Sequence, residues 1–367
     1  MRALLSIAVA WLALAGSARA QEWLAEYQKQ FRAGIDALQA GRHAEGIAAF
    51  QRCLELRPKD GTCAYNIACG YSLAGEIEPA FEWLGHSVEW GFGNTEGNID
   101  HAKKDADLER LRSDPRFAKS IARMEEMLEK LRRYYAEPAV HLPDSLKGAE
   151  ALPLLVVLHD AGQTKEQVVS GPWKRVADEL GMALVAPSGK FPTADEPARG
   201  MAWFDDPAAY AQRSWIYERT VQDAVSAFRK EHKLDAKRVF LAGEGQGGLV
   251  AFNVGVGGPG LYKGVLVVNA PFVEQLAAAK GSNAGKMGFK ARFLLEEDGD
   301  WFPRDKDLRA LADSLRERLE GWGIACDVST FRRSEQEPDR DHGLILEAIR
   351  ALGPEAAPVE AGTGKKD

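Results

Sequence analysis

The stretch from Arg238 to Gly248 constrains the fold more than any other part of the chain. It opens with the apolar run Val239-Phe-Leu-Ala242, which is typical of a short buried strand. Glycines then stand at positions 243, 245, 247 and 248. Because glycine tolerates positive φ angles and close backbone approach, this spacing predicts a very tight turn and the start of a helix.

The region around this unit alternates short apolar runs with helical patterns. The predicted strands are 154–159, 182–187, 239–243, 264–269, 291–296 and 325–331. The predicted helices are 173–180, 216–233, 307–322 and 342–352, with another that begins at Gln246. Continuous apolar strands are typical of parallel sheets covered on both faces. Residues 137–352 are therefore predicted to form an α/β domain, with ligands at the carboxyl ends of the strands.

Five motifs in this region resemble those of the α/β-hydrolase family. The likeness is closest to the small phospholipase/carboxylesterase-like and polyhydroxybutyrate-depolymerase-like esterases. In chain order the motifs are Leu158-His-Asp-Ala-Gly162, Trp203-Phe-Asp205, Leu234 to Gly243, Glu297 to Pro303 and Asp341-His-Gly343. The resemblance implies the α/β-hydrolase fold, a mostly parallel sheet with helices on both faces. It also implies a mechanism in which a serine attacks a carbonyl, a histidine accepts its proton and a carboxylate orients the histidine.

Gly245 stands where this family has its nucleophilic serine, at the centre of Gly-x-Ser-x-Gly. Gly243 and Gly247 supply the outer glycines, which must be very small because the turn is tight. Centring the motif on Glu244 would place Gln246 at one of these positions, so the register is set. Glycine has no side chain that can attack a carbonyl, and the substitution predicts a retained fold without the family's chemistry.

The resemblance places His342 at the position of the catalytic base and Asp300 at that of the acid, with Asp298 as the alternative acid. An ordinary surface histidine and a solvated acidic loop are the alternatives to these roles. The acidic group from Glu296 to Asp300 lacks histidines at ligand spacing, so neither a metal nor another cofactor is predicted.

The loop His159-Asp160-Ala161-Gly162 stands where the family has the His-Gly-x-Gly of its oxyanion hole. With Gln246 and Trp203, this loop is predicted to form the hole and the pocket. Asp160 replaces a glycine, and its carboxylate would oppose a developing negative charge if it turns into the hole. If the side chain points outward, this objection weakens.

Two functions remain open. In the first, the domain is a pseudohydrolase that serves as a binding or scaffolding module, with a small ester-like ligand as a possible occupant of its pocket. In the second, it is an active hydrolase of carboxylic ester-type substrates that uses Asp300 and His342 with water or an unrecognised nucleophile. Ser170, Ser188 and Ser214 lie in or near predicted loops without the glycines of the tight turn.

Residues 21–136 have a different pattern. Segments 27–60 and 61–94 align at an offset of roughly 34 residues, the period of tetratricopeptide repeats, which this region resembles. The aligned pairs are Gly34 with Ala68, Ala37 with Tyr71, Gly41 with Gly75, Gly46 with Ala80 and Phe50 with Leu84. Beyond them, a helix with apolar Phe117, Ile121, Met124, Leu128 and Leu131 is predicted to cap the array. The repeats form either a groove for a protein or peptide partner or a scaffold for the second domain.

Residues 1–20 have the pattern of a signal peptide, with an apolar run from Leu4 to Ala15 and a cleavage site after Ala20. The run is about 12 residues, shorter than the ~20 of a membrane-spanning helix. The mature chain is expected to be periplasmic or extracellular, without a transmembrane anchor. Export permits disulfides, and Cys53 and Cys63 either pair or are small buried residues at a helix contact.

The formal net charge of −7 gives no indication of a nucleic-acid surface. The tail 353–367 is rich in Pro, Gly, Ala and charged residues, and is predicted to be disordered.

Overall fold

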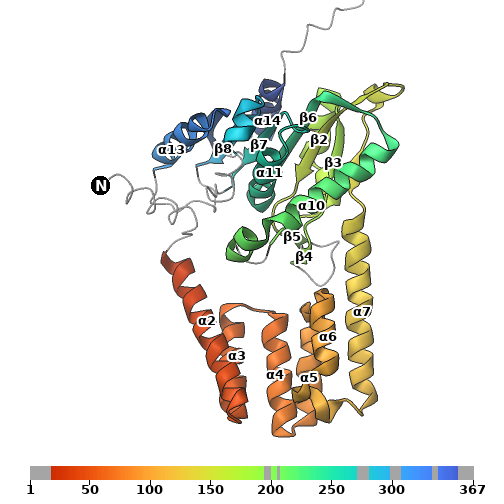
Figure 1. Cartoon of the computed structure of the whole chain (residues 1–367), viewed down its shortest axis with the longest axis vertical. Helices are drawn as coiled ribbons and strands as arrows, with labels where there is room; N and C mark the ends of the chain where they lie inside the picture. Colours follow the sequence, from red (N-terminus) through yellow and green to blue (C-terminus); the bar gives the residue numbers. More distant parts are fainter. Residues whose placement is uncertain are drawn as a thin grey trace, which may run out of the picture. The chain divides into compact units, whose positions relative to one another are not determined.

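The computed structural model describes residues 18–193, 200–204, 207–270, 281–297, 307–332 and 338–353 (Figure 1). These residues fall into two compact units, one that ends at Ala136 and one that begins at Glu137. Each unit has its own hydrophobic core. None of the helices in the ranges given above is long and apolar enough to cross a membrane.

The first unit is entirely helical (Figure 1). Its elements are α2 (Ala18–Gln39), α3 (His43–Leu56), α4 (Gly61–Ala74), α5 (Ile77–Glu89), α6 (Glu96–Lys104) and α7 (Pro115–Ala136), with 3-10 turns η1 (Phe92–Asn94) and η2 (Ala106–Leu111). Helix α2 packs on α3, and α4 packs on α5. Gly41 and Gly75 lie in the two connecting turns with φ angles of 74° and 84°, which glycine adopts without steric cost.

Small residues let the helices of this unit approach closely. A side chain at Gly34 would collide with the ring of Phe50, and one at Gly70 would collide with Ile47. The apolar side of α7 is buried, including all five residues that its periodicity selects: Phe117, Ile121, Met124, Leu128 and Leu131. The repeat pattern did not predict α6, which has few apolar residues.

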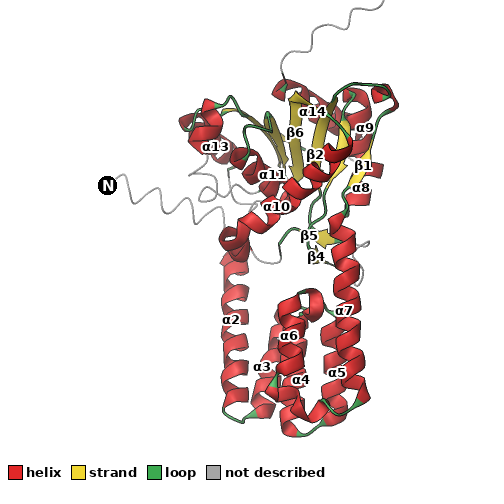
Figure 2. Cartoon of the chain, turned by 45° about the vertical axis from the view of Figure 1, so that its right-hand side comes forward, coloured by secondary structure: helices red, strands yellow, loops and turns green. Residues whose placement is uncertain are grey.

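The second unit is built on a seven-stranded sheet with the order β1-β3-β2-β6-β7-β8-β9. Figure 2 draws the strands of this unit in yellow, among its helices. The strands are β1 (Ala139–His141), β2 (Leu152–Leu158), β3 (Ala183–Ala186), β6 (Leu234–Glu244), β7 (Gly264–Val268), β8 (Lys290–Glu296) and β9 (Ala325–Phe331). Neighbouring strands are parallel except at the β1 edge, where β1 runs antiparallel to β3. Strands β4 (Phe191–Pro192) and β5 (Met201–Ala202) form a separate small hairpin.

Helices cover both faces of the sheet. Alternate strand residues, such as Leu154, Val156 and Leu158, belong to the core with α10 (Pro207–Glu231), α11 (Gly245–Gly257) and α13 (Leu308–Gly321). Their neighbours Leu155 and Val157 belong to a core with α8 (Lys165–Ser170), α9 (Pro172–Leu180) and α14 (Pro338–Leu352). Because side chains alternate across a strand, such double burial requires the continuous apolar runs of the sequence.

The six predicted strands are present, and the predicted helices are present with shifted ends. Helix α10 begins at Pro207 rather than Ile216. The pattern missed α8, a helix of six residues held by a Thr164–Gln167 capping box. It also missed β1, which is three residues long and only half-buried, so that it has no apolar signature.

Candidate functional site

The tight turn joins the end of β6 directly to α11. Gly245 is its first helical residue, with a φ of +49°. A side chain at Gly243 would meet the backbone of Gly247, and one at Gly247 would meet the carbonyl oxygens of Leu158 and His159. The outer glycines therefore permit two close contacts, one within the turn and one between the turn and the end of β2.

The carboxylate of Asp160 occupies the space that a side chain at position 245 would need. A Cβ added to Gly245 would overlap both carboxylate oxygens of Asp160. Asp160 Oδ1 accepts hydrogen bonds from the backbone N–H of Gln246, at 2.9 Å, and of Ala161, at 2.7 Å. Gln246 follows Gly245 and Ala161 lies in the loop after β2, the two places from which the resemblance to α/β-hydrolases predicts the donors of an oxyanion hole.

The loop that carries Asp160 is fixed by further hydrogen bonds. The side-chain oxygen of Gln163 accepts the N–H of Asp160 at 3.2 Å. Gly162 donates its N–H to the carbonyl of Met201 at 2.9 Å, and Met201 donates its N–H to the carbonyl of Gln163 at 2.9 Å. Gly162 has a φ of +83°, which lets the chain turn after the aspartate. Asp160 is thus presented by an ordered loop.

His159 is a buried residue that supports this loop. Its Nε2 accepts the N–H of Gly189 at 3.0 Å, so Nδ1 carries the proton and donates it to the carbonyl of Asp160 at 2.7 Å. Burial lowers the pKa of His159 to about 4, which keeps the ring neutral near pH 7. His159 therefore orients the backbone of Asp160.

Gln246 and Trp203 connect the turn to the segment that precedes α10. The side-chain oxygen of Gln246 accepts the N–H of Trp203 at 3.0 Å and that of Phe204 at 3.3 Å, while its Nε2 donates to the carbonyl of Phe204 at 3.1 Å. Trp203 is fully buried and donates its indole N–H to the carbonyl of His159 at 2.8 Å. The polar groups of both side chains bind neighbouring backbone.

His342 lies in the first half of α14 and is 8% exposed. Its Nε2 is 3.0 Å from Oε1 of Glu179, near the end of α9. The hydrogen bond to His342, followed by that to Arg175, lowers the pKa of the Glu179 carboxyl. Asp300 and Asp298 lie outside the residues that the structure describes.

Several predicted alternatives to the missing serine have defined partners. Ser170 donates to the carbonyl of Glu166 at 2.7 Å, and buried Ser188 donates to the carbonyl of Gly189 at 2.9 Å. Glu244 is the residue before α11 and has extended backbone angles. The side chain of Ser214 is outside the described part of the chain.

A polar contact near the carboxyl ends of the strands joins Asn269, which no motif revealed, to Glu296 of the acidic group. Asn269 follows β7 with a left-handed φ of 48°, uncommon for a residue other than glycine. Its Nδ2 donates to Oε2 of Glu296, the last residue of β8, at 3.1 Å. This contact links the ends of two neighbouring strands.

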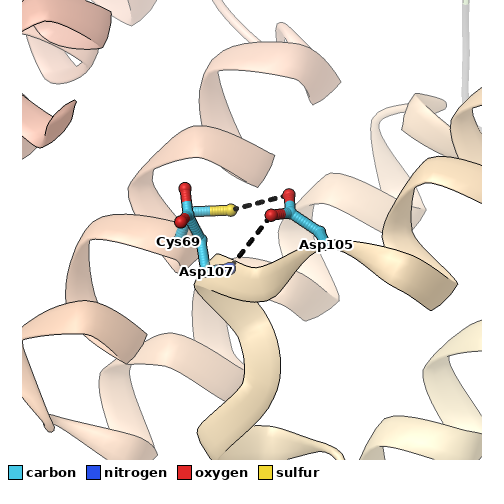
Figure 3. Close-up of side chains that lie close together, drawn as sticks. All are labelled: Cys69, Asp105 and Asp107. Carbon is cyan, nitrogen blue, oxygen red and sulfur yellow. Dashed lines mark hydrogen bonds between the residues drawn. The ribbon is translucent and has the colours of Figure 1, made fainter.

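A second polar cluster lies in the helical unit, where Cys69, Asp105 and Asp107 bring potential ligand atoms within 4.8 Å of one another (Figure 3). Asp105 accepts a hydrogen bond from the hydroxyl of Tyr65 at 2.7 Å, and the Cys69 thiol lies 3.8 Å from the same oxygen. The other carboxylate oxygen of Asp105 accepts the N–H of Asp107, at the start of η2, at 3.0 Å. Burial raises the pKa of the Cys69 thiol well above its usual range. The contacts describe a junction between α4 and η2.

The family model described as Esterase PHB depolymerase matches residues 137–284. Among solved structures, esterase PE8 is 15% identical with a TM-score of 0.44, over 58% of this chain and 98% of that chain. A carboxylesterase from Mesorhizobium loti is 17% identical with a TM-score of 0.43, over 55% of this chain and 89% of its own. A phospholipase/carboxylesterase from Dyadobacter fermentans is 15% identical with a TM-score of 0.41, over 58% of this chain and 95% of that chain. No curated protein matches the chain.

The matched segment contains the loop after β2, strand β6 and the tight turn. Parallel strands in the order β3-β2-β6-β7-β8-β9 surround that turn, with helices on both faces. The unit that begins at Glu137 therefore has an α/β architecture, and its residues 137–284 are similar to the Esterase PHB depolymerase family.

Proposed function

We propose that this α/β-hydrolase domain is a pseudohydrolase that acts as a binding or scaffolding module. The observation that carries the proposal is the place of the Asp160 carboxylate. It fills the space of the missing serine side chain and takes the two N–H groups that would stabilise an oxyanion.

Charge explains why this arrangement opposes ester hydrolysis. A tetrahedral intermediate needs its negative oxygen within hydrogen-bond distance of the hole's donors, each worth ~3–4 kcal/mol to the transition state. The donors at Gln246 and Ala161 already hold a carboxylate oxygen. A substrate would have to displace it and then develop its own charge beside a negative group.

The partner of His342 supports the same proposal. A serine hydrolase needs the ring of its histidine between the nucleophile and an acid. In this chain the histidine at the family's position is hydrogen-bonded to Glu179 of α9. In the family's mechanism Nε2 is the atom that accepts the nucleophile's proton, so His342 has to leave Glu179 before it can act as a base.

Turnover of activated esters tests the proposal. Purified mature protein should hydrolyse p-nitrophenyl acetate and butyrate no faster than a His342→Ala variant. Hydrolysis that is well above background and disappears in His342→Ala would refute the pseudohydrolase and favour the active enzyme.

A second candidate follows from the same carboxylate. Carboxylates form covalent ester intermediates in several enzyme classes, and Asp160 places one at the nucleophile position. Its Oδ1 would remain on the two N–H groups while the other oxygen attacks a saturated carbon. The bond from that carbon to its leaving group breaks, and the leaving group departs with the electron pair. Water would then hydrolyse the resulting ester.

Reaction with an alkyl epoxide separates this candidate from the first. A carboxylate nucleophile predicts an adduct on the peptide that contains Asp160, detected by mass spectrometry and absent from Asp160→Asn. The pseudohydrolase predicts no adduct at this residue.

We further propose that the helical unit is a tetratricopeptide-type module that recruits a protein or peptide, and that the chain is exported. The close approaches at Gly34 and Gly70 and the two left-handed glycine turns support the repeat assignment. N-terminal sequencing of the protein recovered from the exported fraction should start at Gln21. An intact N-terminus retained in the cell would contradict export.

A further inference from the structure

Two cysteines meet in the core of the helical unit. Cys53 lies near the end of α3, and Cys63 lies near the start of α4, which packs against α3. Both side chains are fully buried. Each thiol is among the neighbouring groups that shift the pKa of the other.

Tyr27 of α2 contacts both thiols. The Cys53 Sγ is 3.7 Å from the carbonyl oxygen of Tyr27, and the Tyr27 hydroxyl is 3.5 Å from the Cys63 Sγ. The same hydroxyl donates to Asp60 at 2.8 Å, and Asp60 caps α4 by accepting the N–H groups of Thr62 and Cys63. The thiol pair thus sits at the junction of α2, α3 and α4.

We propose that Cys53 and Cys63 form a structural disulfide that joins α3 to α4. The other two cysteines have separate surroundings. Cys69 contacts Asp105 across the junction with η2, and Cys326 lies in the α/β unit, where its Sγ is 3.8 Å from the carbonyl of Arg316. The proposal does not depend on the fate of the serine position.

The bond forms by exchange with an external disulfide, either a small molecule such as oxidised glutathione or a protein disulfide. The thiolate of one cysteine attacks the reagent and releases a thiol, which leaves a mixed disulfide. The second thiolate then displaces the remaining half of the reagent as another thiol. The two cysteines are oxidised by two electrons, the reagent is reduced by two electrons, and the two cysteine protons end on the released thiols.

The surroundings of the pair determine when the exchange takes place. Burial raises the pKa of the Cys53 thiol to about 11, and burial and the charge of Asp60 raise that of Cys63 further. Thiolate is therefore scarce once the three helices have packed, and both sulfurs are out of reach of a bulky reagent. The bond closes during folding, before α2 covers the pair.

Peptide mapping of the refolded protein tests the assignment without any substitution. The full mature chain is reduced and unfolded, then refolded with excess oxidised glutathione, and its free thiols are alkylated in denaturant. Tryptic cleavage leaves Cys63 and Cys69 on one fragment, so chymotryptic cleavage after Tyr65 is added to separate them. We expect a Cys53–Cys63 linked peptide two hydrogen atoms lighter than the sum, with Cys69 and Cys326 alkylated. Alkylation of all four cysteines, or a link through Cys69, would overturn the proposal.

Thermal unfolding adds a second readout, with Cys69→Ser as the matched control. The oxidised protein should show a helical-unit Tm on the order of 5–10 °C above that of the reduced protein, because the bond restricts the unfolded chain. Cys69→Ser should keep this difference, whereas Cys53→Ser and Cys63→Ser should lose it. A wild-type Tm that does not respond to reductant, or a response that survives Cys53→Ser, contradicts the disulfide.

Discussion

Substituting Gly245 with alanine is the most direct test of how the Asp160 carboxylate and the turn share space. Alanine adds only a Cβ. The residue must still adopt a φ of +49°, and its Cβ must displace the Asp160 carboxylate. The left-handed backbone costs ~1–2 kcal/mol for a residue with a Cβ. Displacement breaks two charge-assisted hydrogen bonds, each worth about 1.5–3 kcal/mol.

The sum of these terms is an upper bound, because Asp160 is half-exposed and water replaces part of what is lost. We therefore expect Gly245→Ala to lower the free energy of unfolding by about 3–5 kcal/mol. In an Asp160→Gly background, only the backbone strain should remain, about 1–2 kcal/mol. The double-mutant cycle should show a coupling energy of ~2–3 kcal/mol between the two positions.

Two other glycines of the same domain separate the terms. Gly162 has a φ of +83° but no atom within 4 Å of the place that a Cβ would take, so Gly162→Ala should report strain alone, about 1–2 kcal/mol. Gly343 is helical with nothing within 4 Å, and Gly343→Ala should be neutral or stabilising by up to ~1 kcal/mol. Urea unfolding followed by circular dichroism measures the three variants of the cycle and the two control glycine variants. A loss of stability in Gly245→Ala that is no larger than in Gly162→Ala, or that is the same with and without Asp160, would refute the clash between residue 245 and the Asp160 carboxylate.

Three further predictions concern the chemistry and charge of the site. Gly245→Ser alone should not react with a fluorophosphonate probe, because the Asp160 carboxylate occupies the N–H groups of the predicted oxyanion hole. Gly245→Ser combined with Asp160→Gly should be labelled at residue 245. Equal labelling of both variants would refute the blocking role of Asp160. The pKa of His159 is about 4 in the folded protein and has its ordinary value of 6.5 in the unfolded chain. Between these two pH values the unfolded chain therefore binds more protons than the folded protein. The free energy of unfolding should fall by about 3 kcal/mol from pH 6.5 to 4. His159→Gln should remove most of that slope in pH-dependent unfolding, and an unchanged slope would contradict the buried neutral ring. His342 lowers the pKa of Glu179, so their contact stabilises the folded protein only while Glu179 is ionised. Glu179→Gln should therefore be less stable than the parent above pH 4.5, and this difference in stability should shrink as the pH falls. A difference that stays constant down to acid pH would count against the pair.

The apolar runs and the glycine spacing were sufficient to predict the α/β fold and the tight turn. Both are local signals: double burial of a strand requires an unbroken apolar run, and a turn this tight requires glycine at 243 and 247. The short elements α8, β1, β4 and β5 were not predictable in this way, because each has too few residues to show a period.

The sequence by itself determined that position 245 has no nucleophile, since the absence of a side chain requires no structure. It left the direction of Asp160 open, because residues 160 and 245 lie far apart in the chain and meet only where β2 and β6 pair side by side. The tertiary structure decided that the Asp160 carboxylate occupies the space that a side chain at position 245 would take, where it binds the N–H groups of Ala161 and Gln246. It also placed Glu179 beside His342, a contact between two helices that no spacing along the chain encodes. Hydrogen bonds between distant segments depend on how the sheet and its helices pack, and only the folded chain brings their partners within reach.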